Sequence, residues 1–148
     1  MTSFIACLKT MIAEESFIIV SIHVGPGDYK VNLTDVFAQL RPRITHQHFI
    51  IGGDLNAARH FDDVYGGQWY HRFFNELSKQ GFHDCHWAIH GKEIQSFCGP
   101  QTNEPYQDDH IFTDSPLAPK VIDCRIIDNP VLRELSDHAP VLLLVNDE

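Results

Sequence analysis

The N-terminal part of the chain alternates between apolar runs and short polar breaks. Residues 3–12 (SFIACLKTMI) and 17–24 (FIIVSIHV) are rich in β-branched and aromatic side chains, and the polar stretch AEES separates them. Runs of this kind predict two strands joined as a hairpin. The segment GPGDYK then breaks the pattern, because glycine and proline favour turns.

The next apolar positions change to a helical spacing, at Leu33, Val36, Phe37 and Leu40. Asn32 precedes them as a candidate N-cap and Pro42 follows, so the spacing predicts a short helix over 33–40. Residues 48–52 (HFIIG) show no polar alternation, which is typical of a strand covered on both faces. We therefore expect this strand to be central in a sheet.

A second helical period occupies the segment QWYHRFFNELSKQG and ends near Gly81. Its helical spacing favours core packing of the aromatic side chains over stacking on a nucleic-acid base, and the apolar face comprises Trp69, Phe73, Phe74 and Leu77. Further strands are expected at 82–87, 94–98, 109–113, 120–128 and 139–145. This order predicts an α/β (α+β) fold with a mixed sheet that helices cover on an outer face.

Candidate chemistry begins where the central strand ends, in HFIIGGDLNAAR (48–59). In an extended segment, Asp54 and Asn56 point the same way and offer an anionic oxygen beside a neutral amide. Such a pair suits a water nucleophile next to a phosphate, because the carboxylate can deprotonate the water while the amide contacts phosphate or metal. Gly52 and Gly53 remove side chains where a substrate or a backbone comes close. A simple turn is the alternative interpretation.

Polar groups occur at three further strand ends. Asp109 heads the strand 110–112, His23 closes the run FIIVSIHV, and Ser136-Asp137-His138 precedes Pro140 and a long apolar strand. Ligand sites in layered α/β folds favour strand ends, where loops converge over a rigid sheet. An isolated Ser-Asp-His segment also serves as a cap, and that alternative stays open.

Composition limits the class of protein. The 148 residues suffice for one domain, and 43% of them are hydrophobic. The formal charge of −9 has the wrong sign for holding a polyanion, unless divalent cations reverse the local field. With no leader and no run long enough to span a membrane, we expect a cytoplasmic protein whose cysteines are reduced thiols: Cys7, Cys85, Cys98 and Cys124.

Four segments in a fixed order resemble one family. His23, GDLN at 53–56, DDHIF at 108–112 and SDHAP at 136–140 are similar to motifs of the endonuclease/exonuclease/phosphatase superfamily. This superfamily includes DNase I, the apurinic endonucleases, sphingomyelinases and inositol-phosphate phosphatases. The resemblance covers roughly residues 3–146 and implies a DNase I-like β-sandwich with helices on its outer faces and a mixed, mostly antiparallel sheet.

The resemblance implies a hydrolase that uses Mg²⁺, or Mn²⁺, and metal-assisted attack of water on phosphorus. It implies that Asp54 positions and activates the water and that Asn56 contacts the phosphate or the metal. The metal ligands would be Asp137, Asp54 and Asn56. The substrate would be a phosphate ester, either a nucleic acid or a phosphorylated small molecule.

The same resemblance gives roles to the imidazoles. His138 would stabilise the phosphoryl oxygens or act as a base, and Asp109 would orient it. His23 would lie near the phosphate or the leaving oxygen. Together with Asp54 and Asn56, these three residues make up the expected catalytic set.

The sequence also departs from the family pattern. Members begin with a strand that carries an Asn and a later strand with a Gln-Glu pair, whose Glu is the principal metal ligand; neither precedes the hairpin here. Glu14 and Glu15 lie in the hairpin turn, which is the wrong context. We therefore expect residues 1–148 to form a single, N-terminally truncated domain with one exposed apolar sheet face.

A second copy of the chain, a separate N-terminal partner or a repacked core would cover that face. A catalytically inactive half-domain that acts as a binding module, and needs such a partner, is therefore the alternative function. The missing Glu favours this alternative, whereas the retained acids, amide and imidazoles favour the enzyme.

Other polar groups carry weaker indications. The pair His46 and His48 and the run at 83–86 match no common structural zinc pattern. GPGDYK lacks the spacing of a P-loop. The loop after GDLN could either touch substrate or be simply solvated; its polar residues are Arg59, His60, Asp62 and Asp63.

Overall fold

The computed structural model describes residues 3–12, 14–25, 27–44, 48–99 and 105–146. Its elements, in chain order, are β1 (Phe4–Ile12), β2 (Glu15–His23), α1 (Tyr29–Ile44), β3 (His48–Asp54), α2 (His60–Tyr65), α3 (Trp69–Lys79), β4 (His83–Asp84), α4 (Cys85–His90), β5 (Asp109–Thr113), the 3-10 helix η1 (Ala118–Lys120), β6 (Val121–Ile126), α5 (Pro130–Leu135) and β7 (Val141–Val145). None of the helices in these ranges has the length and apolar character to cross a bilayer.

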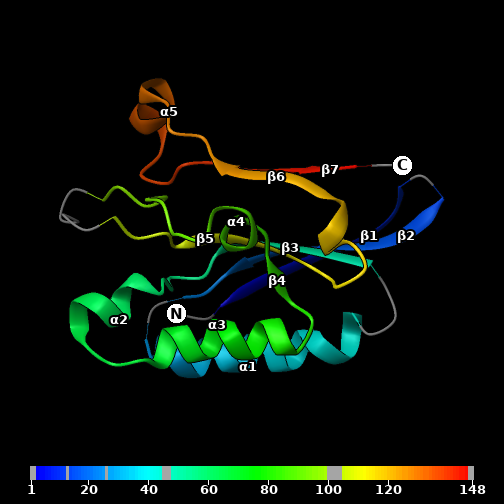
Figure 1. The fold of residues 1–148 in the computed structure, drawn as a ribbon, viewed down its shortest axis with the longest axis horizontal. Helices are drawn as coiled ribbons and strands as arrows, with labels where there is room; N and C mark the ends of the chain where they lie inside the picture. The colour runs from blue at the N-terminus through cyan, green and yellow to red at the C-terminus, as the bar shows by residue number, and fades with distance from the viewer. Residues whose placement is uncertain (1–2, 13, 26, 45–47, 100–104, 147–148) are drawn as a thin grey trace.

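The strands form two sheets. The larger has the order β1-β2-β3-β5-β4, in which β2 and β3 are parallel and the other neighbours are antiparallel. The smaller pairs β6 with β7 antiparallel and lies over the inner face of the larger one (Figure 1). The result is an open, mixed and mostly antiparallel sandwich. The predicted hairpin and the central position of β3 are confirmed.

Helices α1 and α3 cover the outer face of the large sheet (Figure 1). The four apolar positions predicted for the first helix are all buried against β2 and β3. The helix is longer than the predicted 33–40, because Asp28 caps it earlier: its Oδ1 accepts a hydrogen bond from Val31 N, 3.3 Å away. Pro42 lies in the last turn, where a missing N–H and a ring clash disturb few hydrogen bonds.

The segment after α3 differs from the prediction of strands at 82–87 and 94–98. Strand β4 holds two residues only, and α4 begins because the Asp84 side chain accepts a hydrogen bond from Trp87 N. Gly91, with a φ of 62°, ends that helix. Residues 94–98 form a loop whose single bridge joins Phe97 to His138. Helices α2 and α5 were not predicted from the sequence.

The apolar exposure expected from the sequence is present along the edge strand β1. The exposed fractions of Phe4, Leu8 and Met11 are 61%, 59% and 62%. On the small sheet, Ile122 and Leu144 are exposed as well. The described residues therefore leave apolar surface on both layers of the sandwich uncovered.

Candidate active site

Strand register places three of the expected catalytic residues in one row. His23 is directly opposite Asp54, and Asp54 is directly opposite Asp109. Directly opposed residues on neighbouring strands point to the same face of a sheet. The row therefore lies on the inner face, at one end of β2, β3 and β5.

The segment before β7 adds His138 to this row. His138 Nδ1 lies 2.8 Å from Asp109 Oδ2, and His138 Nε2 lies 3.9 Å from Asp54 Oδ2. On the other side, His23 Nε2 is 3.6 Å from the same Asp54 oxygen. One carboxylate oxygen is thus flanked by two imidazoles at distances beyond a direct hydrogen bond.

Asn56 is bound closely to Asp54. Its N–H donates to Asp54 Oδ1 at 2.8 Å, and its Nδ2 donates to Asp54 Oδ2 at 3.1 Å and to the Val24 carbonyl at 2.9 Å. Asn56 has a φ of 48°, which Asn tolerates better than most residues. The turn and the chemical interpretation of GDLN are therefore compatible, because the hydrogen bonds of the turn fix the Asp54 carboxylate.

Charge at the site is predominantly negative. Burial raises the pKa of Asp54, and the negative charge of Asp109 raises it further. The hydrogen bond from Asn56 and the two imidazoles lower it, but the net shift is upward. Burial alone would lower the pKa of His138, but the hydrogen bond and charge of Asp109 outweigh it and raise that pKa. Asp54 is thereby a stronger base than a free carboxylate, and His138 holds its proton more tightly than a free imidazole does.

Asp108 belongs to this charge cluster, although we did not select it from the sequence. It is buried, and no described residue hydrogen bonds to its Oδ1. Burial and the neighbouring Asp54 raise the pKa of Asp108 to about 7. Strand alternation would place it on the face opposite Asp109, so the only signal in the sequence was the doubled acid in DDHIF.

Asp137 stands apart from the tight cluster. It is exposed, and its carbonyl accepts a hydrogen bond from Cys98 N, while its charge helps to raise the pKa of His138. Within the described ranges, no three His, Cys, Asp or Glu side chains are already arranged around a common metal position. The donor chemistry nevertheless fits a hard cation, because oxygen ligands and surplus negative charge gather at Asp54 and Asp108.

A buried imidazole holds the loops that carry these residues. His110 Nε2 lies 2.9 Å from the carbonyls of both Ala57 and Gln107, and its Nδ1 is 3.3 Å from Asp84 Oδ2. Burial opposes its protonation, but Asp84 and Glu93 raise the pKa of His110. The imidazolium can donate on both sides, so it ties the loop after Asn56 to the start of β5.

The loop after GDLN is buried in part: Arg59 and Asp62 are buried, whereas Asp63 is exposed. Arg59 is buried, with its guanidinium between the rings of Phe74 and Trp87 at 4.1 Å from each centroid. Its Nη1 bonds to Asp84 Oδ2 at 2.9 Å. The following residues form α2, where Asp62 Oδ2 accepts a hydrogen bond from the His71 N–H.

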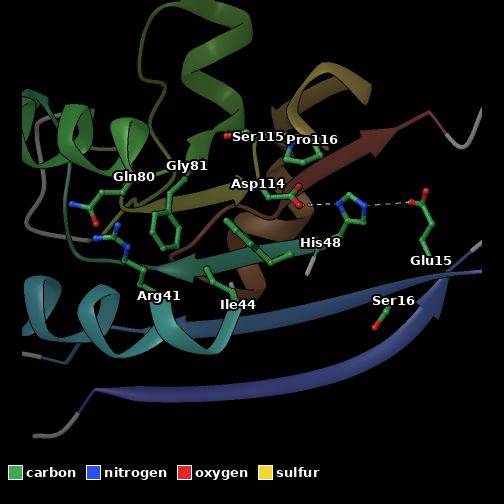
Figure 2. A pocket seen from close by; sticks show the side chains of 12 residues that line it. Glu15, Ser16, Arg41, Ile44, His48, Gln80, Gly81, Asp114, Ser115 and Pro116 are labelled. Carbon is green, nitrogen blue, oxygen red and sulfur yellow. Dashed lines mark hydrogen bonds and ion pairs between the residues drawn. The ribbon is translucent and has the colours of Figure 1, made fainter. Parts of the chain in front are cut away.

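A cavity of about 770 Å³ lies at the opposite end of β3 and β5 (Figure 2). There His48 contacts Asp114 at 2.8 Å and Glu15 at 3.8 Å. The cavity shares no residue with the acid and imidazole cluster. His46 lies outside the described residues.

The sequence matches no protein-family model and no curated protein. Solved structures with a similar fold include an AP endonuclease from Archaeoglobus fulgidus, at 21% identity and a TM-score of 0.73 over 95% of this chain. A 3' phosphatase from Neisseria bound to a product DNA hairpin aligns at 14% identity and a TM-score of 0.70 over 95% of this chain. An AP endonuclease from Leishmania major aligns at 17% identity and a TM-score of 0.71 over 96%.

The chain has a DNase I-like fold. The family resemblance of the four motifs is thereby confirmed at the level of the fold. The alignments cover 65%, 64% and 54% of the three solved chains, so this chain spans about two thirds or less of their length. The motif residues meet at one end of this DNase I-like sandwich.

Proposed function

We propose that the protein is a divalent-metal-dependent phosphoester hydrolase of the nuclease or phosphatase type. The observation that carries the proposal is the meeting of His23, Asp54 and Asp109 in one row with His138 above it. Two acids and two imidazoles in a partly buried site suit proton transfer to and from water and a phosphoryl group. The names of the similar structures, AP endonuclease and 3' phosphatase, support the same class of reaction.

Asp54, Asn56 and Asp137 would hold Mg²⁺, or Mn²⁺ in its place. When bound, the cation would neutralise charge on the phosphoryl oxygens and lower the pKa of a water ligand. The raised pKa of Asp54 suits it to accept a proton from water that sits between it and the phosphate. Asn56 holds this carboxylate in place through two hydrogen bonds.

His138 would act through its second nitrogen. Asp109 accepts from the Nδ1–H, which leaves Nε2 directed towards Asp54 Oδ2. In the imidazolium form, the Nε2–H donates to a phosphoryl oxygen. In the neutral form with the proton on Nδ1, the unprotonated Nε2 accepts a proton. His23 is 45% exposed, so it lies at the rim, where it would donate a proton to the leaving oxygen.

The proposed substrate is a phosphate ester, with nucleic acid favoured over a phosphorylated small molecule. Two of the similar structures are AP endonucleases, and a third holds a DNA product. The net charge of −9 opposes a polyanion, so cations at the site or basic residues from a partner would be needed. Binding of DNA should therefore weaken when divalent cations are removed.

Hydrolysis assays test this proposal directly. We would measure cleavage of DNA with an abasic site and of a generic phosphodiester, with Mg²⁺ and with EDTA. Asp54→Asn should lower kcat about 10²-fold to 10⁴-fold, which is the range for removing a positioned base. The exposed Asp35→Asn in α1 is the matched control and should retain the wild-type rate. Equal rates for Asp54→Asn and wild type would exclude the assignment.

The second candidate is a catalytically inactive binding module that needs a second copy or an N-terminal partner. It is supported by the exposed β1 strand and by the incomplete coverage of the similar structures. Under this proposal, the partner covers the apolar surface of β1 and the small sheet. No turnover by wild type with any divalent metal, together with stable association, would favour this candidate.

A further inference from the structure

Ser96 is a fully buried hydroxyl residue in the loop between α4 and β5. Its Oγ accepts hydrogen bonds from two consecutive backbone N–H groups, those of Asp108 at 2.9 Å and Asp109 at 3.0 Å. Both groups lie at the start of β5, where the strand enters the candidate site. One oxygen thus fixes the backbone from which the Asp109 carboxylate extends.

The backbone of the same residue contacts the other half of the site. The Ser96 carbonyl accepts a hydrogen bond from Ala139 N at 2.7 Å, directly after His138 in the chain. The next residue, Phe97, forms a β-bridge with His138, and the two rings lie 5.0 Å apart between centroids. Ser96 therefore lies between the two segments whose side chains form the Asp109–His138 hydrogen bond.

We propose that Ser96 is the positioning residue that sets the Asp109–His138 contact. No hydrogen bond joins its side chain to His138, Asp54 or His23 within the described residues, so it acts through the Asp109 backbone. The effect of Ser96 on catalysis rests on the proposed function. The effect of Ser96 on the geometry of the Asp109–His138 pair does not depend on that function.

The physical reason is that Ser96 Oγ is the acceptor to which both N–H groups donate within the described residues. β3 pairs with β5 only from Asp109 onward, so the N–H of Asp108 lies before the paired part of the strand. Removing the hydroxyl would take the acceptor away from a buried donor, Asp108 N, and a partly buried one, Asp109 N, so the start of the strand would move to find another. Catalytic residue pairs tolerate only displacements well below 1 Å, so even a small movement of Asp109 relative to His138 would matter.

The tautomer of His138 reports on this geometry without any need for activity. Long-range ¹H–¹⁵N correlation spectra of the 148-residue chain, at a pH where His138 is neutral, distinguish protonated Nδ1 from protonated Nε2. Wild type should carry the proton on Nδ1, because Asp109 accepts it. Ser96→Ala should shift the population towards protonated Nε2, whereas Ser96→Thr should retain the wild-type tautomer.

Two further variants separate positioning from stability. Thr113→Val removes another fully buried hydroxyl, at the far end of the same strand, and should lower stability without changing the His138 tautomer. Ser96→Cys keeps a side chain of similar size but a weaker acceptor, so it should give an intermediate tautomer ratio even if Ser96→Ala fails to fold. The proposal would be overturned if the His138 tautomer were unchanged in both Ser96→Ala and Ser96→Cys. If Ser96→Ala does not fold, an unchanged tautomer in Ser96→Cys alone would overturn it.

The kinetic experiment is kept separate. If wild type hydrolyses a phosphodiester, Ser96→Ala should lower kcat by about 100-fold with KM little changed, and Ser96→Thr should restore most of it. If wild type is inactive, the proposed function fails, and the tautomer measurement alone decides the role of Ser96. A normal kcat for Ser96→Ala would contradict the positioning role.

Discussion

Asp54 shows how one side chain serves both a turn and a site. Its Oδ1 accepts the N–H of Asn56, while its Oδ2 lies between His23 and His138. The sequence predicted that Asp54 and Asn56 share a site, because residues two apart in a strand point the same way. It could not predict the positive φ of Asn56, which directs its amide back onto Asp54 instead of outward.

The residues that support the site left little trace in the sequence. Ser96 is an isolated serine in a loop, and its role depends on the approach of β5 and the segment before β7. His110 alternates with Asp109 and so belongs to the opposite face, where it joins a buried ion network. Such roles arise from contacts between distant segments, which local periodicity does not record.

Gly53 is the residue whose replacement should damage the site's backbone most. It has a φ of 143°, and an added Cβ would lie 1.9 Å from the Ile22 carbonyl oxygen. Gly53→Ala should therefore lower the free energy of unfolding by about 3 kcal/mol or more, measured in urea. Gly52→Ala is the neighbouring control: its Cβ would meet Ile111 at 3.4 Å. A Gly53→Ala protein as stable as Gly52→Ala would contradict this account.

Elements with long, regular patterns were predictable, and short ones were not. The β1–β2 hairpin, β3, α3 and β5 follow from apolar runs or helical spacing. The aromatic and imidazole residues of segment 82–87 are compatible with either a strand or a helix. The hydrogen bond from Trp87 N to the Asp84 side chain starts α4 there. Residues 94–98 form no strand because they are held by hydrogen bonds to the Tyr106 carbonyl and by a single bridge from Phe97 to His138. The residues of the candidate site could be selected from the sequence because each of its motifs ends or begins an element.

Helix α4 carries a buried imidazole that should make stability depend on pH. His86 is fully buried, and no described residue hydrogen bonds to either ring nitrogen. Burial lowers the pKa of His86. Asp84 raises this pKa, whereas His90, His110 and Arg59 lower it further, so the net shift is downward. Below the unfolded value of about 6.5, the unfolded chain binds a proton that the folded chain excludes.

The unfolding free energy of wild type should therefore fall on acidification more steeply than that of His86→Leu. The difference in slope should approach, at most, about 1.4 kcal/mol per pH unit below pH ~6.5. Urea unfolding of both proteins between pH 8 and pH 5 measures it. Phe82→Leu removes part of another buried ring and should keep the wild-type pH slope. Parallel curves for wild type and His86→Leu would show that His86 does not bind its proton on unfolding.

The whole molecule is an open sandwich with a bare edge. Nearly every residue of β1 is exposed, and the small sheet holds two strands only. The sequence analysis expected an exposed apolar sheet face, and the exposed apolar side chains of β1 agree with that expectation.

Long apolar edge strands promote association. We expect the isolated chain to associate at micromolar concentrations, and Leu8→Lys with Met11→Lys should shift it towards monomer. Light scattering coupled to size-exclusion chromatography measures the change. Val31→Lys, which replaces an exposed apolar residue on α1, is the control and should leave the mass unchanged. A wild-type chain that stays monomeric would contradict a β1 interface.

Acids and imidazoles from distant segments meet at one end of the sandwich, and we propose that they hold a cation beside a phosphoryl group. Paramagnetic broadening by Mn²⁺ in NMR spectra locates such a cation directly. We predict that low concentrations of Mn²⁺ broaden the imidazole signals of His23 and His138 first, and that Asp54→Asn abolishes this selectivity. Broadening centred instead on Asp62 and Asp63 of α2, or no selective broadening in wild type, would contradict the claim.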